Sequence, residues 1–224
     1  MKVVAGILAG GIGSRVGAKL PKQFIEIGGI PILIRSLKKF SSFQVVVAMN
    51  PEWMDYAKNL FKKYNLKDIS LIEGGKTRQL SSYNATSFFK DYNPDYILIH
   101  DAARCFVREN LIRRLIEKIN GEKFDGVIPV ISSTDSLVEV GDSVRYLSRD
   151  KVFKVQTPQI FRFNVLYNVH KILEKRGDVN FTDDGSMLVE CGYRVGVVNG
   201  DHGNIKISTP LDLKISQEMV GDEG

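Results

Sequence analysis

Six short apolar runs recur along this 224-residue chain, and segments with helical periodicity separate them. The runs cover residues 2–8, 44–50, 68–74, 96–101, 124–130 and 193–200. Between them, the apolar residues of 51–65 and of 108–120 each fall on one face of a helix. Strands that alternate with helices form βαβ units, and strands that are apolar throughout are buried on both faces. The pattern predicts an α/β fold with a mainly parallel sheet and helices on both faces.

Residues 134–153 interrupt this alternation. They contain two short strand-like stretches with polar flanks around Gly141-Asp142, which predicts an antiparallel hairpin. Such a hairpin in a parallel α/β chain is often an arm, and the alternative is an edge hairpin that folds on its own sheet. A chain of this length buries roughly 70–75% of its unfolded surface, which is enough for one core. We therefore expect one domain over residues 1–224, with a hairpin arm at about 131–153.

The chain is basic, with a formal net charge of +5 and a sequence pI of about 9.1. The basic residues are dispersed, and their densest pairs fall in predicted helices, where such pairs usually form solvated faces. No nucleic-acid-binding module is present, so phosphorylated small molecules explain the positive charge better. The two cysteines have no metal or redox spacing, and no apolar run is long enough to span a membrane. We expect a cytoplasmic protein that binds neither nucleic acid nor membranes.

Three of the predicted strands end in segments that could bind a ligand. A glycine loop follows the first strand, "EGGKTR" (73–78) follows the third, and "HDAAR" (100–104) ends the fourth. In open α/β sheets, ligands bind beyond the carboxyl ends of the strands. The sequence therefore predicts a ligand site where these three segments meet.

The glycine loop does not match two familiar nucleotide-binding motifs. It lacks the Gly-Lys-Ser/Thr of a Walker phosphate loop. Gly11, Gly13 and Val16 fail the dinucleotide pattern at its last position, and no acidic residue ends the second strand. The loop amides could still approach a phosphate, with Arg15 and Lys22 nearby. On spacing alone, a phosphate cradle and a plain strand-to-helix turn fit equally well.

Several polar residues at predicted strand ends and helix starts have both a structural and a chemical interpretation. Asp101 could hold Mg²⁺ bound to a triphosphate, with Arg104 nearby, or it could cap the following segment. Thr182 is expected to be the N-cap of a helix. Lys206 is expected in a short strand, where it needs an anionic partner or an exposed edge. Packed or solvated side chains, and no metal site, are predicted for His100, His170 and His202.

Six motifs then point to one enzyme family: "LAGGIGSRVGAKLPKQF", "GGKTRQLS", "HDAAR", "QTPQIF", "TDDGSML" and "NIKIS". In their order and spacing, from residue 3 to about 215, the chain resembles the cytidylyltransferases that activate sugar-alcohol phosphates. The resemblance is strongest to the 2-C-methyl-D-erythritol 4-phosphate cytidylyltransferase family. It implies a Rossmann-like nucleotidyltransferase fold, Mg²⁺, and a homodimer formed through the arm. The implied reaction transfers CMP from CTP to a polyol phosphate, 2-C-methyl-D-erythritol 4-phosphate, and releases diphosphate for isoprenoid precursor synthesis.

The resemblance also implies roles for residues at matching positions. Catalytic charge stabilisation would fall to Arg15, Lys22, Arg149 and Lys206. The nucleotide would be bound by Ala9, Gly10, Gly11, Gly13, Gly74, Gly75, Ser81 and Asp101. The acceptor would be held by Arg104, Ser136, Thr157 and Thr182. In this scheme Asp101 lies on the metal side, and Ser136 and Arg149 act from the arm in the partner subunit's site.

The chain departs from the family pattern at a few positions, and other functions stay open. The departures are Cys105 for a usual proline, Ser136 for threonine, Asp184 for glutamate and Lys76 for an acidic residue. Ribitol-5-phosphate cytidylyltransferase is the nearest alternative, since "LPKQFIEIGGIPILI" fits that relative at least as well, whereas "HDAAR" favours the methylerythritol enzyme. A non-catalytic nucleotide-binding protein on the same fold is an alternative of a different class. A dehydrogenase is opposed by the failed dinucleotide pattern.

Overall fold

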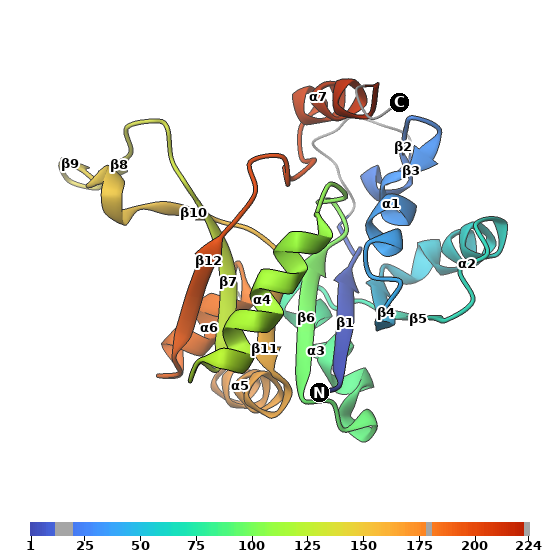
Figure 1. The fold of residues 1–224 in the computed structure, drawn as a ribbon, viewed down its shortest axis with the longest axis horizontal. Helices are drawn as coiled ribbons and strands as arrows, with labels where there is room; N and C mark the ends of the chain where they lie inside the picture. Colours follow the sequence, from blue (N-terminus) through green and yellow to red (C-terminus); the bar gives the residue numbers. More distant parts are fainter. Residues whose placement is uncertain (12–19, 178–180, 222–224) are drawn as a thin grey trace.

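A mainly parallel sheet forms the centre of the molecule (Figure 1). The computed structural model describes residues 1–11, 20–177 and 181–221. The strands of this sheet are β1 (Val3–Leu8), β4 (Gln44–Met49), β5 (Ile69–Glu73), β6 (Tyr96–Asp101), β7 (Gly126–Ser132), β10 (Phe153–Val155), β11 (Gln159–Arg162) and β12 (Val195–Asn199). The helices are α1 (Ile32–Lys38), α2 (Met54–Lys63), α3 (Arg78–Phe88), α4 (Glu109–Gly121), α5 (Phe163–Arg176), α6 (Asp184–Glu190) and α7 (Pro210–Gly221).

The strand pairing confirms the predicted α/β fold. All six predicted strands are present, and they correspond to β1, β4, β5, β6, β7 and β12. Strand β1 pairs in parallel with β4 and β6, β4 pairs with β5, and β12 pairs with β7. The sequence missed β11, which pairs antiparallel with both β6 and β7. Only Ile160 and Phe161 of its four residues are apolar, a pattern too short to predict a strand.

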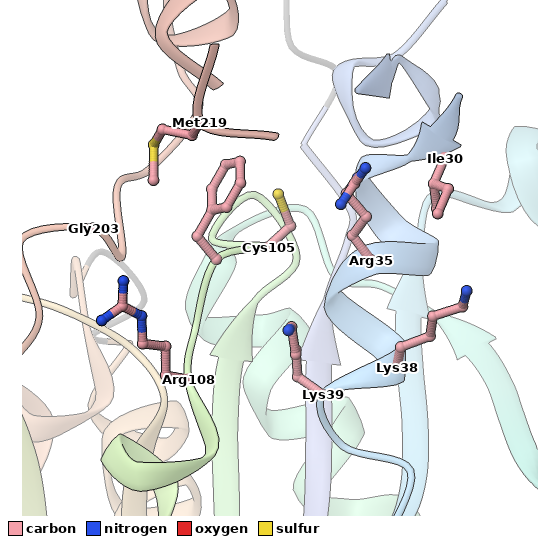
Figure 2. Close-up of a pocket in the computed structure, with 9 residues that line it drawn as sticks. Ile30, Arg35, Lys38, Lys39, Cys105, Arg108, Gly203 and Met219 are labelled. Atoms are coloured by element: carbon pink, nitrogen blue, oxygen red, sulfur yellow. The ribbon is translucent and has the colours of Figure 1, made fainter. Parts of the chain in front are cut away.

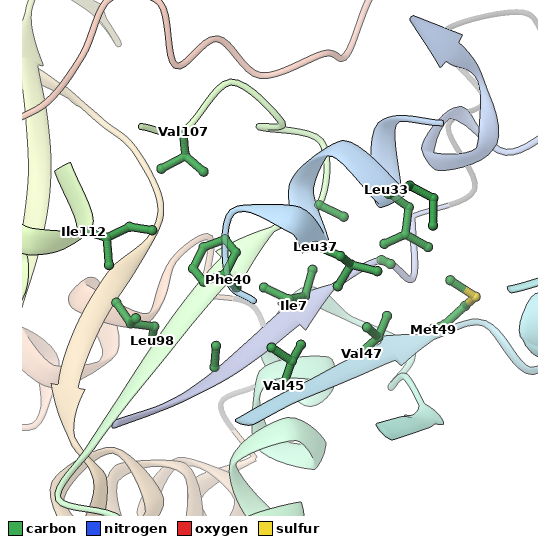
Figure 3. Packing of buried hydrophobic residues seen from close by; sticks show 14 of the residues in the cluster. Ile7, Leu33, Leu37, Phe40, Val45, Val47, Met49, Leu98, Val107 and Ile112 are labelled. Atoms are coloured by element: carbon green, nitrogen blue, oxygen red, sulfur yellow. The ribbon is translucent and has the colours of Figure 1, made fainter. Parts of the chain in front are cut away.

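Helices cover both faces of the sheet, as predicted, because side chains alternate between the two faces along each strand. In β1, Ala5 and Ile7 belong to the core between the sheet and helices α1, α2 and α4. Val4 and Leu8 belong to the core on the other face, between the sheet and helices α3, α5 and α6. Figure 3 shows the first core, where strand side chains such as Ile7 meet Leu37 from α1. Each large apolar side chain buried in this way contributes about 1.5–3 kcal/mol to folding.

The predicted hairpin is confirmed as an arm that extends away from the sheet (Figure 1). Strands β8 (Val138–Val140) and β9 (Val144–Tyr146) pair antiparallel with each other in a two-stranded sheet of their own. The chain leaves the main sheet at the end of β7 and returns through β10, which pairs with β7. The alternative of an edge hairpin on the main sheet is therefore wrong.

Two local predictions are also wrong. Helix α6 is capped by Asp183 and not by Thr182, because the Asp183 carboxylate accepts a hydrogen bond of 3.0 Å from the Ser186 N–H. Both residue types cap helices well, so the local pattern could not choose between neighbours. Lys206 lies in an irregular segment and not in a strand. That segment is held by a hydrogen bond of 2.9 Å from the Ile207 N–H to the Ala103 carbonyl.

The remaining short elements lie near the carboxyl ends of the parallel strands. A small ribbon of β2 (Glu26–Ile27) and β3 (Ile30–Pro31) leads into α1, and α7 lies beside it (Figure 1). Together with the loop after β6, these elements enclose a third, smaller core of Ile27, Ile32, Cys105, Phe106 and Ile207. In the described ranges, no helix is long and apolar enough to cross a membrane.

Candidate active site

A cavity of about 420 Å³ opens at the carboxyl ends of β1 and β6, where the sequence predicts a ligand site. Eight of the predicted site residues line it: Ala9, Gly10, Gly11, Lys22, Gly75, Ser81, Asp101 and Lys206. Their side chains and backbone come from four segments that are widely separated in the sequence. The structure therefore brings the glycine loop, "GGKTRQLS", "HDAAR" and "NIKIS" to one place.

The wall formed by residues 74–81 is shaped by glycine and by a helix cap. The Gly75 N–H donates to Ser81 Oγ at 3.1 Å, and Thr77 caps α3 by accepting from the Leu80 N–H at 3.1 Å. A Cβ at Gly75 would overlap Leu80, so only glycine lets the loop turn this tightly against α3. Gly74 lies behind the wall, where its N–H donates to the Met49 carbonyl at 2.7 Å. The Ser81 hydroxyl is thus fixed at the cavity surface.

The opposite wall is held by two neighbouring side chains, Lys22 and Gln23. The buried Gln23 amide donates to the Ala9 carbonyl at 2.9 Å and ties this turn to the end of β1. Lys22 Nζ donates to the Ile207 carbonyl at 3.0 Å and lines the cavity. An ammonium group at the cavity surface is a compact positive charge that can attract a phosphate.

Asp101 and two basic residues form the charged floor of the cavity. Arg78 Nε donates to Asp101 Oδ1 at 3.0 Å, and Lys206 Nζ donates to Asp101 Oδ2 at 2.7 Å. Burial alone would raise the pKa of Asp101, but Arg78 and Lys206 outweigh it and hold that pKa well below its usual range. The Asp101 carboxylate is therefore ionised at neutral pH. Lys206 has the anionic partner that the sequence analysis required.

Behind this floor lies a second carboxylate, which the sequence analysis did not place in the site. Asp184 is fully buried, and its Oδ2 accepts from Arg78 Nη1 at 2.7 Å. Its Oδ1 accepts a hydrogen bond from the Ser82 hydroxyl, which also contacts His170 Nε2 at 3.3 Å. Burial alone would lower the pKa of Arg78. The charges of Asp184 and Asp101 have a larger effect in the opposite direction, so the pKa of Arg78 is raised overall. Arg78 is thus clamped between Asp101 and Asp184.

The family of the chain follows from comparison with known proteins. The family model described as 2-C-methyl-D-erythritol 4-phosphate cytidylyltransferase matches residues 3–222. The chain belongs to this family. Two cytidylyltransferases of that name are similar over nearly their whole length. The one from Clostridium beijerinckii is 36% identical over 97% of this chain and 98% of the relative. The one from Thermosipho melanesiensis is 35% identical over 94% of each chain.

A solved structure agrees with this assignment. The crystal structure of 4-diphosphocytidyl-2C-methyl-D-erythritol synthase from Anaerococcus prevotii is 27% identical and has a TM-score of 0.85. The match covers 98% of this chain and 96% of that one. The protein is therefore an enzyme, a cytidylyltransferase with the nucleotidyltransferase fold. The match favours the methylerythritol enzyme over its ribitol-5-phosphate relative.

Other predicted site residues of this cytidylyltransferase lie near the cavity but outside its lining. The Arg104 guanidinium donates from Nη1 to the Asn204 carbonyl at 2.9 Å and from Nη2 to the Val155 carbonyl at 3.3 Å. The Thr157 hydroxyl is buried and accepts from the Asp101 N–H at 3.0 Å. In the described chain, both residues therefore support the loops around the cavity. Their predicted contacts with the acceptor stay predictions.

The arm residues and a few others lie farther away. Arg149 Nη2 donates to Ser136 Oγ at 3.3 Å, so the two predicted arm residues contact each other. Neither lines the cavity of its own chain, and the exposed Thr182 does not line it either. Gly13 and Arg15 lie outside the described residues. The nucleotide contact of Gly13 and the catalytic role of Arg15 therefore stay predictions.

The predicted magnesium ion has one candidate carboxylate, Asp101. Within the described ranges, no group of three or more His, Cys, Asp or Glu side chains is arranged to hold a metal ion. Mg²⁺ often binds through only one or two carboxylates together with substrate phosphates. The donor set at the cavity therefore fits a metal that arrives with the nucleotide, and it does not form a dedicated metal cage.

The buried histidines should make folding stability depend on pH. Burial lowers the pKa of His170 from 6.5 to about 4, although Asp184 opposes this, and it lowers the pKa of His100 to about 3. The unfolded chain then binds protons below pH 6.5 that the folded chain does not, so stability falls as the pH drops from 6.5 toward 4. Each histidine contributes up to about 1.4 kcal/mol per pH unit to this slope.

We expect His170→Gln to make this slope shallower by up to about 1.4 kcal/mol per pH unit. Urea unfolding followed by circular dichroism at several values between pH 7 and 4.5 would measure the slope. The control is His202→Gln, which changes an exposed turn residue and should leave the slope unchanged. An unaltered slope in His170→Gln would show that His170 does not resist protonation in the folded protein.

Proposed function

We propose that the cavity binds CTP and that the enzyme transfers CMP to 2-C-methyl-D-erythritol 4-phosphate with release of diphosphate. The observation that carries this proposal is the convergence of Lys22, Lys206 and Arg78 around a cavity that is also lined by the backbone of the glycine segments. Cationic side chains suit the triphosphate, and glycine amides allow a ligand to approach the backbone closely. Ser81 and the backbone at Gly75 are placed on one wall, where a cytosine base could be recognised.

The proposed reaction is an in-line displacement. An oxygen of the acceptor's phosphate attacks the α-phosphorus of CTP and forms a new P–O bond, and the bond from the α-phosphorus to the bridging oxygen breaks. The electron pair leaves with diphosphate. Lys22 and Lys206 stabilise the negative charge that develops during transfer. A phosphate monoester is already an anion, so the step needs positioning and charge stabilisation, and no general base.

Mg²⁺ would fit at Asp101 together with the nucleotide phosphates, and when bound it would neutralise part of their charge. Side chains of this chain orient the carboxylate that would hold the ion. Arg78 and Lys206 fix both oxygens of the Asp101 carboxylate through the contacts described above. The carboxylate is therefore already oriented before any ligand binds.

We also propose that the arm pairs two copies of the enzyme. It exposes Val138, Val140, Val144 and Tyr146, and the exposed fractions of Val140 and Tyr146 reach 75% and 76%. Apolar side chains gathered on so small a ribbon are a typical interaction surface. A second subunit that covers them would bring Ser136 and Arg149 to the site of the other chain.

Val140→Asp should therefore convert the enzyme from a dimer into a monomer, because a charge would be buried in the interface. Sedimentation at several protein concentrations would measure the oligomeric state. The matched control is Val189→Asp on α6, which is 61% exposed and lies away from the arm. A wild-type enzyme that sediments as a monomer at all concentrations would contradict the proposal, as would a Val140→Asp variant that remains dimeric.

An assay of diphosphate release tests the proposed function. It would pair each of the four ribonucleoside triphosphates with 2-C-methyl-D-erythritol 4-phosphate and with ribitol 5-phosphate. We expect release with CTP and the methylerythritol acceptor to exceed every other combination by at least about tenfold. Faster turnover of ribitol 5-phosphate would assign the enzyme to that relative. Absence of release with every pair would revive the non-catalytic alternative.

A further inference from the structure

A second, smaller cavity of about 140 Å³ lies beside α1 and the loop that follows β6 (Figure 2). Its lining comes from four separate segments and consists of Ile30, Arg35, Lys38, Lys39, Cys105, Phe106, Arg108, Gly203 and Met219. Four of these residues are cationic and none is acidic. The cavity is much smaller than the nucleotide cavity, so it could admit a small ion but not a nucleotide.

Three of the four cationic side chains face this cavity and have N–H donors that could bind an anion. Arg35 Nε donates to the Ile27 carbonyl at 2.8 Å, and this acceptor is neutral; among the described residues no carboxylate pairs with Arg35. Within the described residues, the Lys39 ammonium has no hydrogen bond or ion pair, although the Lys39 backbone N–H donates to the Ser36 carbonyl at 3.0 Å. Arg108 has one weak partner, Asp201, with Nε and Oδ2 3.4 Å apart. Figure 2 shows Arg35 and Lys39 on one side and Arg108 on the other.

The fourth cation is different. Lys38 points away from the cavity in Figure 2, and its ammonium lies 5.8 Å from the centre of the Tyr64 ring. Its charge also suits the C-terminal end of α1. Lys38 is therefore an ordinary surface residue. Arg35 and Lys39 are four residues apart at the end of α1 and meet through helical spacing. Arg108 precedes α4, about 70 residues further along the chain, so its approach to them is a tertiary contact.

We propose that this cavity is a second anion site, which binds a small multivalent oxyanion of the phosphate class. Three cations around one hollow repel each other, and an anion between them would remove that repulsion. The apolar side chains of Phe106 and Met219 form part of the wall and reduce local solvation, which strengthens the attraction. Inorganic phosphate and diphosphate share this chemistry, and the proposed reaction releases diphosphate.

The site is connected to the nucleotide cavity through two shared loops. Ala102 and Ala103 line the nucleotide cavity, and Cys105 and Phe106, which follow after Arg104, line the small one. Likewise, residues 206 and 208 belong to the nucleotide cavity and Gly203 to the small one. The loops are fastened together by the hydrogen bonds from the Ile207 N–H to the Ala103 carbonyl and from Arg104 to the Asn204 carbonyl. An anion bound at Arg108 would therefore steady both loops and favour CTP binding.

Isothermal titration calorimetry on the full-length enzyme tests this proposal. Diphosphate and inorganic phosphate would be titrated separately, at constant ionic strength, into enzyme whose nucleotide cavity is saturated with CTP. The test variant is Lys39→Gln with Arg108→Gln. The control is Lys62→Gln with Lys63→Gln, which removes the same charge from two exposed residues of α2 that line neither cavity. Circular dichroism and CTP binding check that both variants fold.

We expect the CTP-saturated wild type to bind one further anion, and the test variant to bind it at least about tenfold more weakly. The control should bind it as the wild type does. Of phosphate and diphosphate, the anion that binds more tightly is the one for which the site is built. Equal binding by wild type and test variant would overturn the proposal, and so would equal weakening in the control. If the test variant does not fold, the single change of exposed Lys39 to Gln makes the same comparison.

Discussion

Replacing Lys22 with alanine is expected to lower kcat for CMP transfer by about 100- to 1,000-fold. Lys22 lines the nucleotide cavity, and its ammonium donates to the Ile207 carbonyl at 3.0 Å, which places the positive charge at the cavity wall. An interaction that strengthens as charge develops in the transition state changes kcat more than ground-state binding. The free energy of unfolding should fall by no more than about 1 kcal/mol, the usual contribution of one such hydrogen bond.

The matched control is Lys76→Ala, because Lys76 lines the same cavity and carries the same charge. Steady-state diphosphate release should fall less than about tenfold in this variant. Lys22→Arg should keep more activity than Lys22→Ala, since the charge remains. Near-normal turnover of Lys22→Ala would remove its assigned role. A loss of similar size in Lys76→Ala would mean that only the overall positive potential of the cavity matters.

Arg78→Met should lower the free energy of unfolding by about 3–5 kcal/mol, which is the usual effect of removing one partner of a buried ion pair. Arg78 contacts Asp101 and Asp184 at 3.0 and 2.7 Å, and the Asp184 side chain is fully buried. Without the guanidinium, the two carboxylates lose the positive charge between them, and Lys206 and the more distant Arg104 compensate at Asp101. CTP binding should weaken as well, because Asp101 loses one of the two groups that orient it.

Urea unfolding at pH 7 measures this effect, and the double variant Arg78→Met with Asp184→Asn is the control. Removal of the Asp184 charge should restore part of the lost stability, because the carboxylate that has lost its partner is then absent. If Arg78→Met unfolds with nearly the wild-type free energy, the clamp does not stabilise the fold. If the double variant is no more stable than Arg78→Met, the loss has another origin than unpaired charge.

The same substitution should change the acid stability of the enzyme. Because the folded pKa of Asp101 is held below its unfolded value, Asp101 stabilises the fold at neutral pH, and this contribution is lost as the pH falls below about 4. In Arg78→Met, the pKa of Asp101 should rise toward its usual range, so less of this stability exists to be lost.

Local periodicity was sufficient to predict most of the fold. Strand β1 illustrates why, since its apolar residues alternate between two cores and end at a glycine loop. Such signals lie within about ten residues and need no knowledge of distant parts of the chain. Strand β11 shows the limit, because its place between β6 and β7 depends on partners that its own four residues do not specify.

Half of the residues that line the cavity are also predicted from the sequence, through motifs in a fixed order. Lys22, Ser81, Asp101 and Lys206 were assigned in this way, and the structure brings all four to the same cavity. Arg78 was missed although it stands within "GGKTRQLS", because its partner Asp184 lies 106 residues away. Asp184 had been noted only as a departure from the family pattern.

The sequence by itself determined the order of strands and helices, the family and the chemical types gathered at the strand ends, because these depend on local pattern and motif order. Only the tertiary structure decided which charges meet. The clamp of Arg78 between Asp101 and Asp184, and the meeting of Arg35 and Lys39 with Arg108, depend on how distant segments pack. The strength of an electrostatic interaction depends on the distance between the charges and on their burial. The spacing of residues along the chain specifies neither of these.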